Sequence, residues 1–204
     1  CPQQNTSRSR FKQCFPRVLT PTSFGRSCKN MPINRAVDRA PQPWKNGLGV
    51  QYEITCDGSL PDDWTWRLST ADITQDVPFS IIPGVNREFC VADGNGVVLN
   101  INGVDHRCEP GSITKFRGDD KVFATLIDGP MRALNLMVRD GAAQRRMEIA
   151  SNRDLVEVGL SVACVAILGP AQIVAGSLNE DLSVLDAVLD ANLVINAGVV
   201  AIVR

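Results

Sequence analysis

The fold is decided by residues 64–87, which read WTWRLSTADITQDVPFSIIPGVNR. Aromatic, cationic and turn-forming residues are concentrated in this stretch. Side chains alternate along a strand, so a strand from Trp64 to Asp72 has an apolar face and a polar face. The apolar face would carry Trp64, Trp66, Leu68 and Thr70, and the polar face Thr65, Arg67, Ser69 and Ala71. A second strand over 79–82 and a third over 87–93 would place Arg67 and Arg87 on neighbouring strands of one sheet.

Short apolar or alternating runs recur along the rest of the chain, separated by turn signals such as Asp57-Gly58 and Asn102-Gly103. These runs occupy 50–56, 64–72, 79–82, 87–93, 97–101, 122–128, 132–139, 145–150, 162–168, 184–189 and 193–203. Many short strands of this kind are typical of a sandwich or barrel, including jelly rolls. Only 179–190 also fits a short helix. We therefore expect an all-β protein with little helix.

The first 30 residues differ from the rest, because they contain six Lys or Arg, no acid and no sustained apolar period. Two interpretations stay open: a start assigned too far upstream, with Met31 as the true first residue, or a transit-like leader. No apolar run in this segment is long enough for a signal peptide core or a membrane span. Beyond it we expect a first half over 31–140 that carries the functional site and a more apolar second half over 141–204.

The charge and the cysteines narrow the class of protein. From residue 31 onward, 15 basic residues face all 22 acidic ones, and a body this acidic is a poor candidate for binding nucleic acid. Four cysteines, Cys56, Cys90, Cys108 and Cys164, lie outside the leader without CxxC spacing. They predict buried free thiols in a reducing compartment.

Four motifs in order resemble the HutD/Ves family: WKNGLG at 44–49, WTWRLSTA at 64–71, PFS at 78–80 and PGVNR at 83–87. The likeness continues through Phe116, 128–130 and Asn135 to about residue 139. It implies a cupin fold with two β-barrel halves, a cytoplasmic location and an accessory or regulatory role in histidine utilisation. It also implies a small carboxylate ligand that resembles urocanate or a formylated glutamate. One departure is Val77, where the family usually has glycine.

Several chemistries are disfavoured by the residues themselves. Many cupins hold a metal with two or three histidines, but this chain has a single histidine, His106, in a turn-rich segment. We therefore expect neither a metal nor another cofactor. A Ser-His-Asp site would also need His106, and no serine lies in a Gly-x-Ser-x-Gly turn.

A recognition site remains. Arg67 and Arg87 could bind a carboxylate through paired hydrogen bonds, or could instead be neutralised inside the barrel by Glu53 or Glu88. Along 50–55, alternation places Gln51, Glu53 and Thr55 on one face, which is either a barrel lining or a solvent face. The predicted ligand-binding residues are Asn46, Glu53, Trp66, Arg67, Ser69, Phe79, Ser80 and Arg87.

Some of these residues also fit structural roles. Asn46 precedes Gly47 and so fits a turn, and Trp66 and Phe79 fit the core. The sequence thus predicts a metal-free cupin that binds a small carboxylate. The alternatives are an enzyme with Glu53 as the proton-transferring group and Arg67 as the anchor, and a purely structural protein. The sequence leaves monomer and homodimer open.

Overall fold

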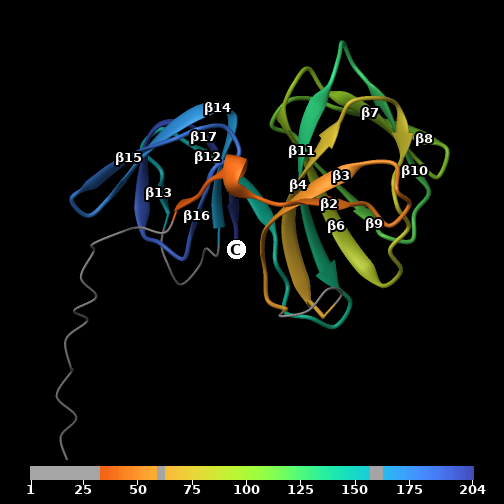
Figure 1. Cartoon of the computed structure of the whole chain (residues 1–204), viewed down its shortest axis with the longest axis horizontal. Coiled ribbons are helices and arrows are strands. Elements are labelled where there is room, and N and C mark those ends of the chain that lie inside the picture. Colours follow the sequence, from red (N-terminus) through yellow and green to blue (C-terminus); the bar gives the residue numbers. More distant parts are fainter. Residues whose placement is uncertain (1–32, 59–62, 157–162) are drawn as a thin grey trace, which may run out of the picture.

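The computed structural model describes residues 33–58, 63–156 and 163–204, so the predicted leader over 1–30 lies outside the described residues. Within the described part, all regular elements are β-strands except for one turn of 3-10 helix, η1 (Ala36–Asp38). The strands form three antiparallel sheets arranged as two halves side by side (Figure 1). The prediction of an all-β protein with little helix is confirmed.

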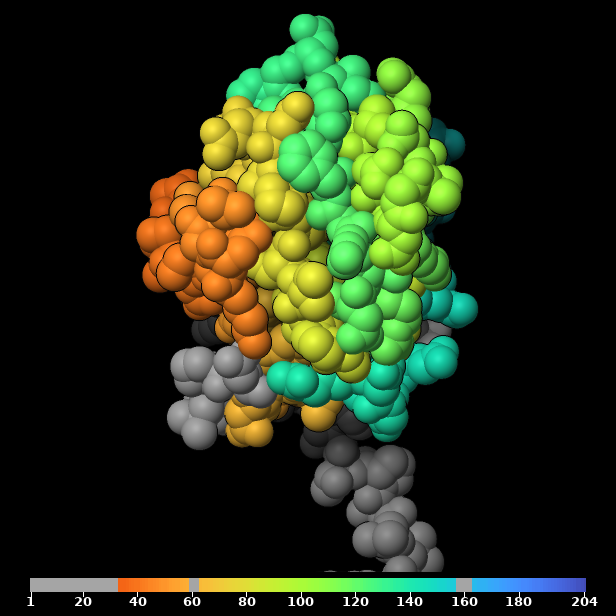
Figure 2. Space-filling view, turned by 90° about the vertical axis from the view of Figure 1, so that its right-hand side faces the viewer, coloured from red at the N-terminus to blue at the C-terminus, as the bar shows by residue number. Residues whose placement is uncertain are grey.

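The first half consists of a six-stranded and a four-stranded sheet. The six-stranded sheet has the order β2-β3-β4-β11-β6-β9 and the four-stranded sheet the order β5-β10-β7-β8. The strands of the larger sheet are β2 (Pro41–Pro43), β3 (Val50–Cys56), β4 (Trp66–Ile73), β6 (Val85–Asp93), β9 (Ile113–Arg117) and β11 (Met131–Arg139). Those of the smaller sheet are β5 (Val77–Pro78), β7 (Val97–Ile101), β8 (Val104–Cys108) and β10 (Val122–Leu126). Figure 2 shows this half from its outer side.

The second half is one seven-stranded sheet with the order β1-β16-β14-β17-β12, in which β13 also pairs with β17 and β15 with β14. Its strands are β1 (Ile33–Asn34), β12 (Met147–Ser151), β13 (Leu155–Val156), β14 (Ala163–Ala175), β15 (Leu178–Leu182), β16 (Ala187–Leu189) and β17 (Leu193–Val203). Its own core contains Ile173, Leu182, Leu193, Ile195 and Ile202. Because β1 pairs with β16, the segment that precedes the first half is tied to the second.

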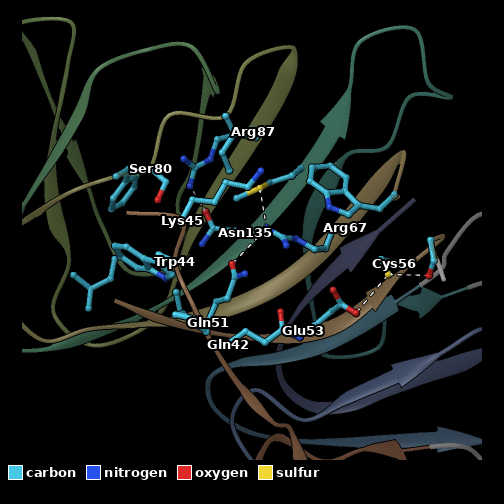
Figure 3. A pocket seen from close by; sticks show the side chains of 18 residues that line it. Gln42, Trp44, Lys45, Gln51, Glu53, Cys56, Arg67, Ser80, Arg87 and Asn135 are labelled. Carbon is cyan, nitrogen blue, oxygen red and sulfur yellow. Dashed lines mark hydrogen bonds between the residues drawn. The ribbon is translucent and has the colours of Figure 1, made fainter. Parts of the chain in front are cut away.

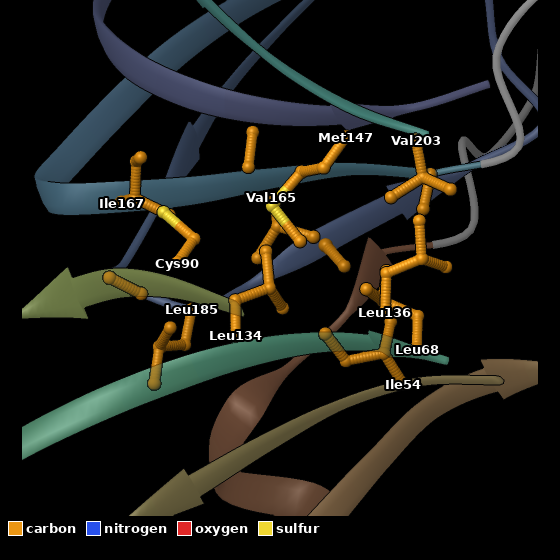
Figure 4. Close-up of a cluster of buried hydrophobic side chains, with 14 of the residues drawn as sticks. Ile54, Leu68, Cys90, Leu134, Leu136, Met147, Val165, Ile167, Leu185 and Val203 are labelled. Atoms are coloured by element: carbon orange, nitrogen blue, oxygen red, sulfur yellow. The ribbon is translucent and has the colours of Figure 1, made fainter. Parts of the chain in front are cut away.

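The six-stranded sheet is covered on both faces. On one face Leu68, Leu134 and Leu136 pack against Val165 and Val203 of the second half (Figure 4). On the other face, Phe89 and Ile73 belong to a core shared with the four-stranded sheet, which supplies Leu99. Since alternate side chains on a strand point to opposite faces, residues next in sequence to Leu68 and Leu136 face the interior of the first half.

The strand predictions hold over 50–56, 97–101 and 193–203, and they fail where the pattern is ambiguous. The prediction of a strand over residues 79–82 is wrong. The backbone of this segment makes isolated hydrogen bonds, from Phe79 to the Val122 carbonyl and from Ile82 to the Gly118 carbonyl, and no strand ladder. The helical alternative over 179–190 is wrong, because β15 and β16 occupy this region. Strand β8 was missed because four of its five residues are exposed and show no apolar alternation. Val77, the departure from the family pattern, is buried and pairs with Ala124.

Candidate functional site

A cavity of about 520 Å³ opens on the inner face of the six-stranded sheet (Figure 3). It is lined by strands β2, β3, β4, β6 and β11, by the turn that follows β2, by residues between β3 and β4, and by residues within 79–82. The lining residues are Gln42, Pro43, Trp44, Lys45, Gln51, Glu53, Cys56, Gly58, Trp64, Arg67, Ala71, Ile73, Phe79, Ser80, Ile82, Arg87, Asn135 and Met137. Among these described lining residues there are three cations and one carboxylate, so together they carry an excess of positive charge.

The two arginines are brought to the same face by strand register. Arg67 on β4 and Arg87 on β6 both lie opposite Met137 on β11. The prediction that they occupy neighbouring strands is therefore wrong, because β11 lies between β4 and β6. Residues directly opposite on paired strands point to the same face, so the two guanidinium groups share the cavity. Their proximity contributes to lowering the pKa of Arg87.

Arg87 is a buried cation, with 7% of its surface exposed. Its Nη2 donates a hydrogen bond to Asn135 Oδ1 at 3.1 Å. Its Cζ lies 5.2 Å from the ring centre of Phe79 and 4.8 Å from that of Phe116, a cation–π arrangement on both rings. Burial, and then the charge of Arg67, lower the Arg87 pKa to about 10, so this side chain is still charged at neutral pH.

No carboxylate of the described residues forms an ion pair with Arg87, and its buried Nε has no hydrogen-bond partner among them. The predicted structural partner, Glu88, lies on the opposite face of β6. There it pairs with Lys115 at 2.7 Å and accepts a hydrogen bond from the Met147 amide at 2.6 Å. The structural interpretation of Arg87 as half of a barrel ion pair with Glu88 is therefore wrong.

Arg67 lies further along the same wall. Its Nη2 donates to Gln51 Oε1 at 3.4 Å and lies 3.6 Å from the Met137 sulfur. Its Cζ is 5.0 Å from the ring centre of Trp64. Trp64 precedes β4 and lines the cavity, so the predicted grouping of Trp64 with Trp66 on one apolar face is wrong.

Glu53 and Cys56 lie on β3, where a β-bulge between Glu53 and Thr55 shifts the register. The bulge places Cys56 on the cavity face where alternation had predicted Thr55. The Cys56 thiol donates to Glu53 Oε1 and to the Gly58 carbonyl, both at 3.4 Å. Burial, with Glu53 as a further contributor, raises the pKa of the Cys56 thiol, so it is protonated at neutral pH and is a hydrogen-bond donor rather than a nucleophile.

The 44–49 motif forms a turn that builds one rim of the cavity. Asn46 Nδ2 donates to the Pro78 carbonyl at 3.0 Å, its backbone N–H to Ser80 Oγ at 3.2 Å, and its Oδ1 accepts from the Leu48 N–H at 3.1 Å. The Asn46 amide thus pins the turn to residues 78–80 and does not line the cavity. The turn positions Trp44, whose ring packs edge-on against that of Phe79 with 5.9 Å between the ring centres.

The structure brings five of the predicted residues into one cavity and leaves three outside it. Glu53, Arg67, Phe79, Ser80 and Arg87 line it, whereas Asn46, Trp66 and Ser69 do not. Trp66 is buried in the core between the two halves, on the face opposite to Arg67, and Ser69 is 1% exposed. Lining residues absent from the prediction include Gln51, Cys56, Trp64 and Asn135. Gln51 shares a face with Glu53 by simple alternation, so its place in the cavity could be predicted from the sequence. Asn135 lines the cavity only because β11 pairs with β4, which the sequence does not indicate.

The described residues contain no group of three or more His, Cys, Asp and Glu side chains arranged to hold a metal ion. His106 is exposed on β8. Within the same part of the chain, no helix is long and apolar enough to cross a membrane.

The arrangement of sheets around this cavity defines a cupin-fold protein. A cupin 2 conserved barrel domain protein from Leptotrichia buccalis superposes with a TM-score of 0.51 at 9% identity, over 76% of this chain and 88% of that one. YlbA from Escherichia coli superposes with a TM-score of 0.61 at 8% identity, over 86% and 91%. These similarities establish the fold alone.

The HutD family model matches residues 36–193, and the chain belongs to the HutD family. It is 33% identical over 124 residues to Protein Ves of Citrobacter koseri, which is 60% of this chain and 61% of that protein. It is 36% identical over 116 residues to an uncharacterized 21.2 kDa protein in the hutC 3′ region of Pseudomonas putida, 56% and 61% of the two chains. The match thus spans about three fifths of these curated relatives. HutD from Pseudomonas fluorescens SBW25, solved in a formate condition, superposes with a TM-score of 0.71 at 29% identity, over 86% of this chain and 97% of that one.

Proposed function

We propose that this protein binds a small carboxylate metabolite in the cavity and acts as an accessory or regulatory factor in histidine utilisation. The observation that carries the proposal is Arg87, a buried guanidinium that lines the cavity and has no carboxylate partner among the described residues. A buried charge without a counter-charge destabilises a protein, and it persists where a ligand supplies that counter-charge.

The cavity matches a carboxylate in both charge and geometry. A guanidinium presents N–H groups in a planar fork that fits the two oxygens of a carboxylate, and charged hydrogen bonds of this kind contribute about 1.5–3 kcal/mol each. Arg87 Nη2 is oriented by Asn135, and Arg67 adds a second cation on the same face. Trp44 and Trp64 add flat apolar surface, which suits a planar ligand.

The role in histidine utilisation is supported by relatives. The Pseudomonas putida relative is encoded in the hutC 3′ region, and HutD of Pseudomonas fluorescens was solved in a formate condition. We infer a urocanate- or formylglutamate-like ligand. The chain matches only about three fifths of the curated relatives, so a shared role is part of the proposal.

Calorimetric titration of the full chain with urocanate, formylglutamate, formiminoglutamate, glutamate and formate tests the proposal. We expect saturable binding of at least one acid, and a loss of affinity of about 30-fold or more in Arg67→Ala, because a charged contact is removed. Arg107→Ala is the matched control, since Arg107 is exposed and pairs with Glu109 away from the cavity. If none of the acids binds to the native protein, the proposed function is wrong.

An enzymatic role is the second candidate, favoured by the position of Glu53 in the cavity. Glu53 would transfer a proton while Arg67 anchors the acid. Product formation is therefore followed in the same titrations. Turnover that is lost in Glu53→Gln would assign the protein to the enzyme class, whereas binding without turnover supports the accessory role.

A further inference from the structure

The cavity has two chemically different ends. Arg87 and Ser80 lie at one end, and Glu53 and Cys56 at the other, with Asn135, Gln51 and Arg67 between them (Figure 3). The first end presents a guanidinium, which only donates hydrogen bonds, whereas an ionised carboxylate at the second end only accepts them. A ligand that fills the cavity therefore meets a donor end and an acceptor end.

The Arg87 guanidinium and the Glu53 carboxylate, at the two ends of the cavity, do not form an ion pair with each other. Among the described residues, the Arg87 side chain donates a hydrogen bond to Asn135, and the Glu53 carboxylate accepts one from the Cys56 thiol at 3.4 Å. A thiol is a weak donor and occupies one carboxylate oxygen, Oε1. Among the described residues, no cation forms an ion pair with Glu53. Both charged ends are thus left for a ligand to satisfy.

The chemistry of Glu53 decides what the far end of the ligand should carry. A second carboxylate there would be repelled by a like charge at close range, and an alkyl end would leave the Glu53 oxygens without a donor once water is displaced. A protonated amine or another N–H group would donate a hydrogen bond to the Glu53 carboxylate and satisfy the oxygen that the Cys56 thiol leaves without a donor among the described residues. Dicarboxylates that lack a nitrogen donor, and simple alkanoates, are therefore poorer partners than acids with a nitrogen donor.

We propose that the cavity selects small acids that also carry a hydrogen-bond-donating nitrogen away from the carboxylate, and that Glu53 is the residue that selects for this nitrogen. The inference rests on the proposed carboxylate-binding function and deepens it. In this arrangement Arg87 binds the carboxylate of the ligand, and Glu53 sets specificity at the other end. Arg67 lies between them, opposite Cys56 on one side and Met137 on the other, and adds a second cation beside the bound carboxylate. Gln51, which bonds to Arg67 at 3.4 Å, connects the two regions.

The test uses three series of acids matched in length, with two to four methylene groups between the ends. One series ends in an amine, as in 5-aminopentanoate; one in a methyl group, as in hexanoate; and one in a second carboxylate, as in adipate. Each is titrated calorimetrically into the native full chain, into Glu53→Gln, and into Glu109→Gln. Glu109 is an exposed glutamate outside the cavity, so its variant is the matched control.

In the native protein and in Glu109→Gln, we expect the amine series to bind at least about tenfold more tightly than the other two, the size of one charged hydrogen bond. In Glu53→Gln, amine binding should weaken about tenfold, while dicarboxylate binding is unchanged or strengthened. Equal binding of all three series by the native protein overturns this inference and leaves carboxylate binding intact. A uniform loss across all series in Glu53→Gln also overturns it, since Glu53 would then support the cavity without selecting. If no acid of any series binds, this inference and the proposed function both fail.

Discussion

Replacing Arg87 with methionine is expected to abolish carboxylate binding and, at the same time, to stabilise the ligand-free protein. The variant removes a fork of donors, so affinity should fall by at least about 100-fold. Burial, and then the charge of Arg67, lower the Arg87 pKa to about 10, which corresponds to roughly 3 kcal/mol of destabilisation in the charged state. Losing the contacts with Phe79 and Phe116 offsets about 1–2 kcal/mol of this gain. We expect a net gain of about 1 kcal/mol, measured by urea unfolding beside calorimetric titration.

The pH dependence of stability follows from the same shift. Because the folded-state pKa of Arg87 is below the unfolded value, the unfolded chain holds more protons than the folded protein as the pH rises through about 10. The cost of burying this group is therefore relieved, and stability rises with pH there. At neutral pH Arg87 is charged in both states, so its cost is fully present. The comparison of native and variant protein is therefore made at neutral pH.

Arg107→Met is the control for this variant. Arg107 is exposed and pairs with Glu109, so its replacement should change stability by no more than about 0.5 kcal/mol and leave binding unchanged. If Arg87→Met unfolds more easily than the native protein by more than about 1 kcal/mol, the guanidinium is a structural element whose contacts outweigh its burial.

The fold was accessible from sequence because strand periodicity and turn residues are local signals. Strands β3, β7 and β17 combine apolar runs with clear boundaries, and their predicted bounds match. Strand β8 was missed because it lies at an edge, where exposure removes the apolar alternation. The 79–82 segment has the composition of a strand, but it bridges between elements without a partner strand of its own.

The cavity was only partly accessible, because it depends on pairing between distant strands. The polar face of β4 predicted Arg67, and alternation along β3 predicted Glu53 and indicated Gln51. The bulge in β3, which places Cys56 instead of Thr55 on the cavity face, has no local sequence signal. Asn135 meets Arg87 only because β11 inserts between β4 and β6, a pairing that separates the two arginines by one strand.

The same pairing explains why the chemistry is confined to the first half. Strand β4 and strand β11 turn apolar side chains such as Leu68 and Leu136 towards the second half, and their alternate residues towards the cavity. The second half thus seals one face of the six-stranded sheet, and none of its described residues lines the cavity. A change in the second half should alter the stability of the protein and leave the chemistry of the cavity unchanged.

Asp186→Ala is expected to show this separation with a large loss of stability. Asp186 is 1% exposed and lies just before β16. Its carboxylate accepts hydrogen bonds from Arg35 Nη1 at 2.8 Å, from the Ala36 amide at 2.8 Å and from the Ser183 amide at 2.9 Å. Removing it leaves the Ala36 and Ser183 amides without their acceptor. It also removes the counter-charge of Arg35, whose Nη1 keeps a hydrogen bond to the Asp181 carbonyl at 2.9 Å. The expected cost is about 3–5 kcal/mol in the free energy of unfolding, measured by urea titration at neutral pH.

Two further variants define what this loss means. Asp186→Asn keeps the size and one acceptor, so an intermediate loss of about 1–3 kcal/mol is expected, whereas Asp38→Ala, on the exposed side of the same segment, should cost no more than about 0.5 kcal/mol. Under conditions where it is folded, Asp186→Ala should bind the same acids as the native chain with unchanged affinity, because Asp186 does not line the cavity. A weakened affinity in the folded variant would show instead that the tie between residues 35–36 and the second half also positions the cavity.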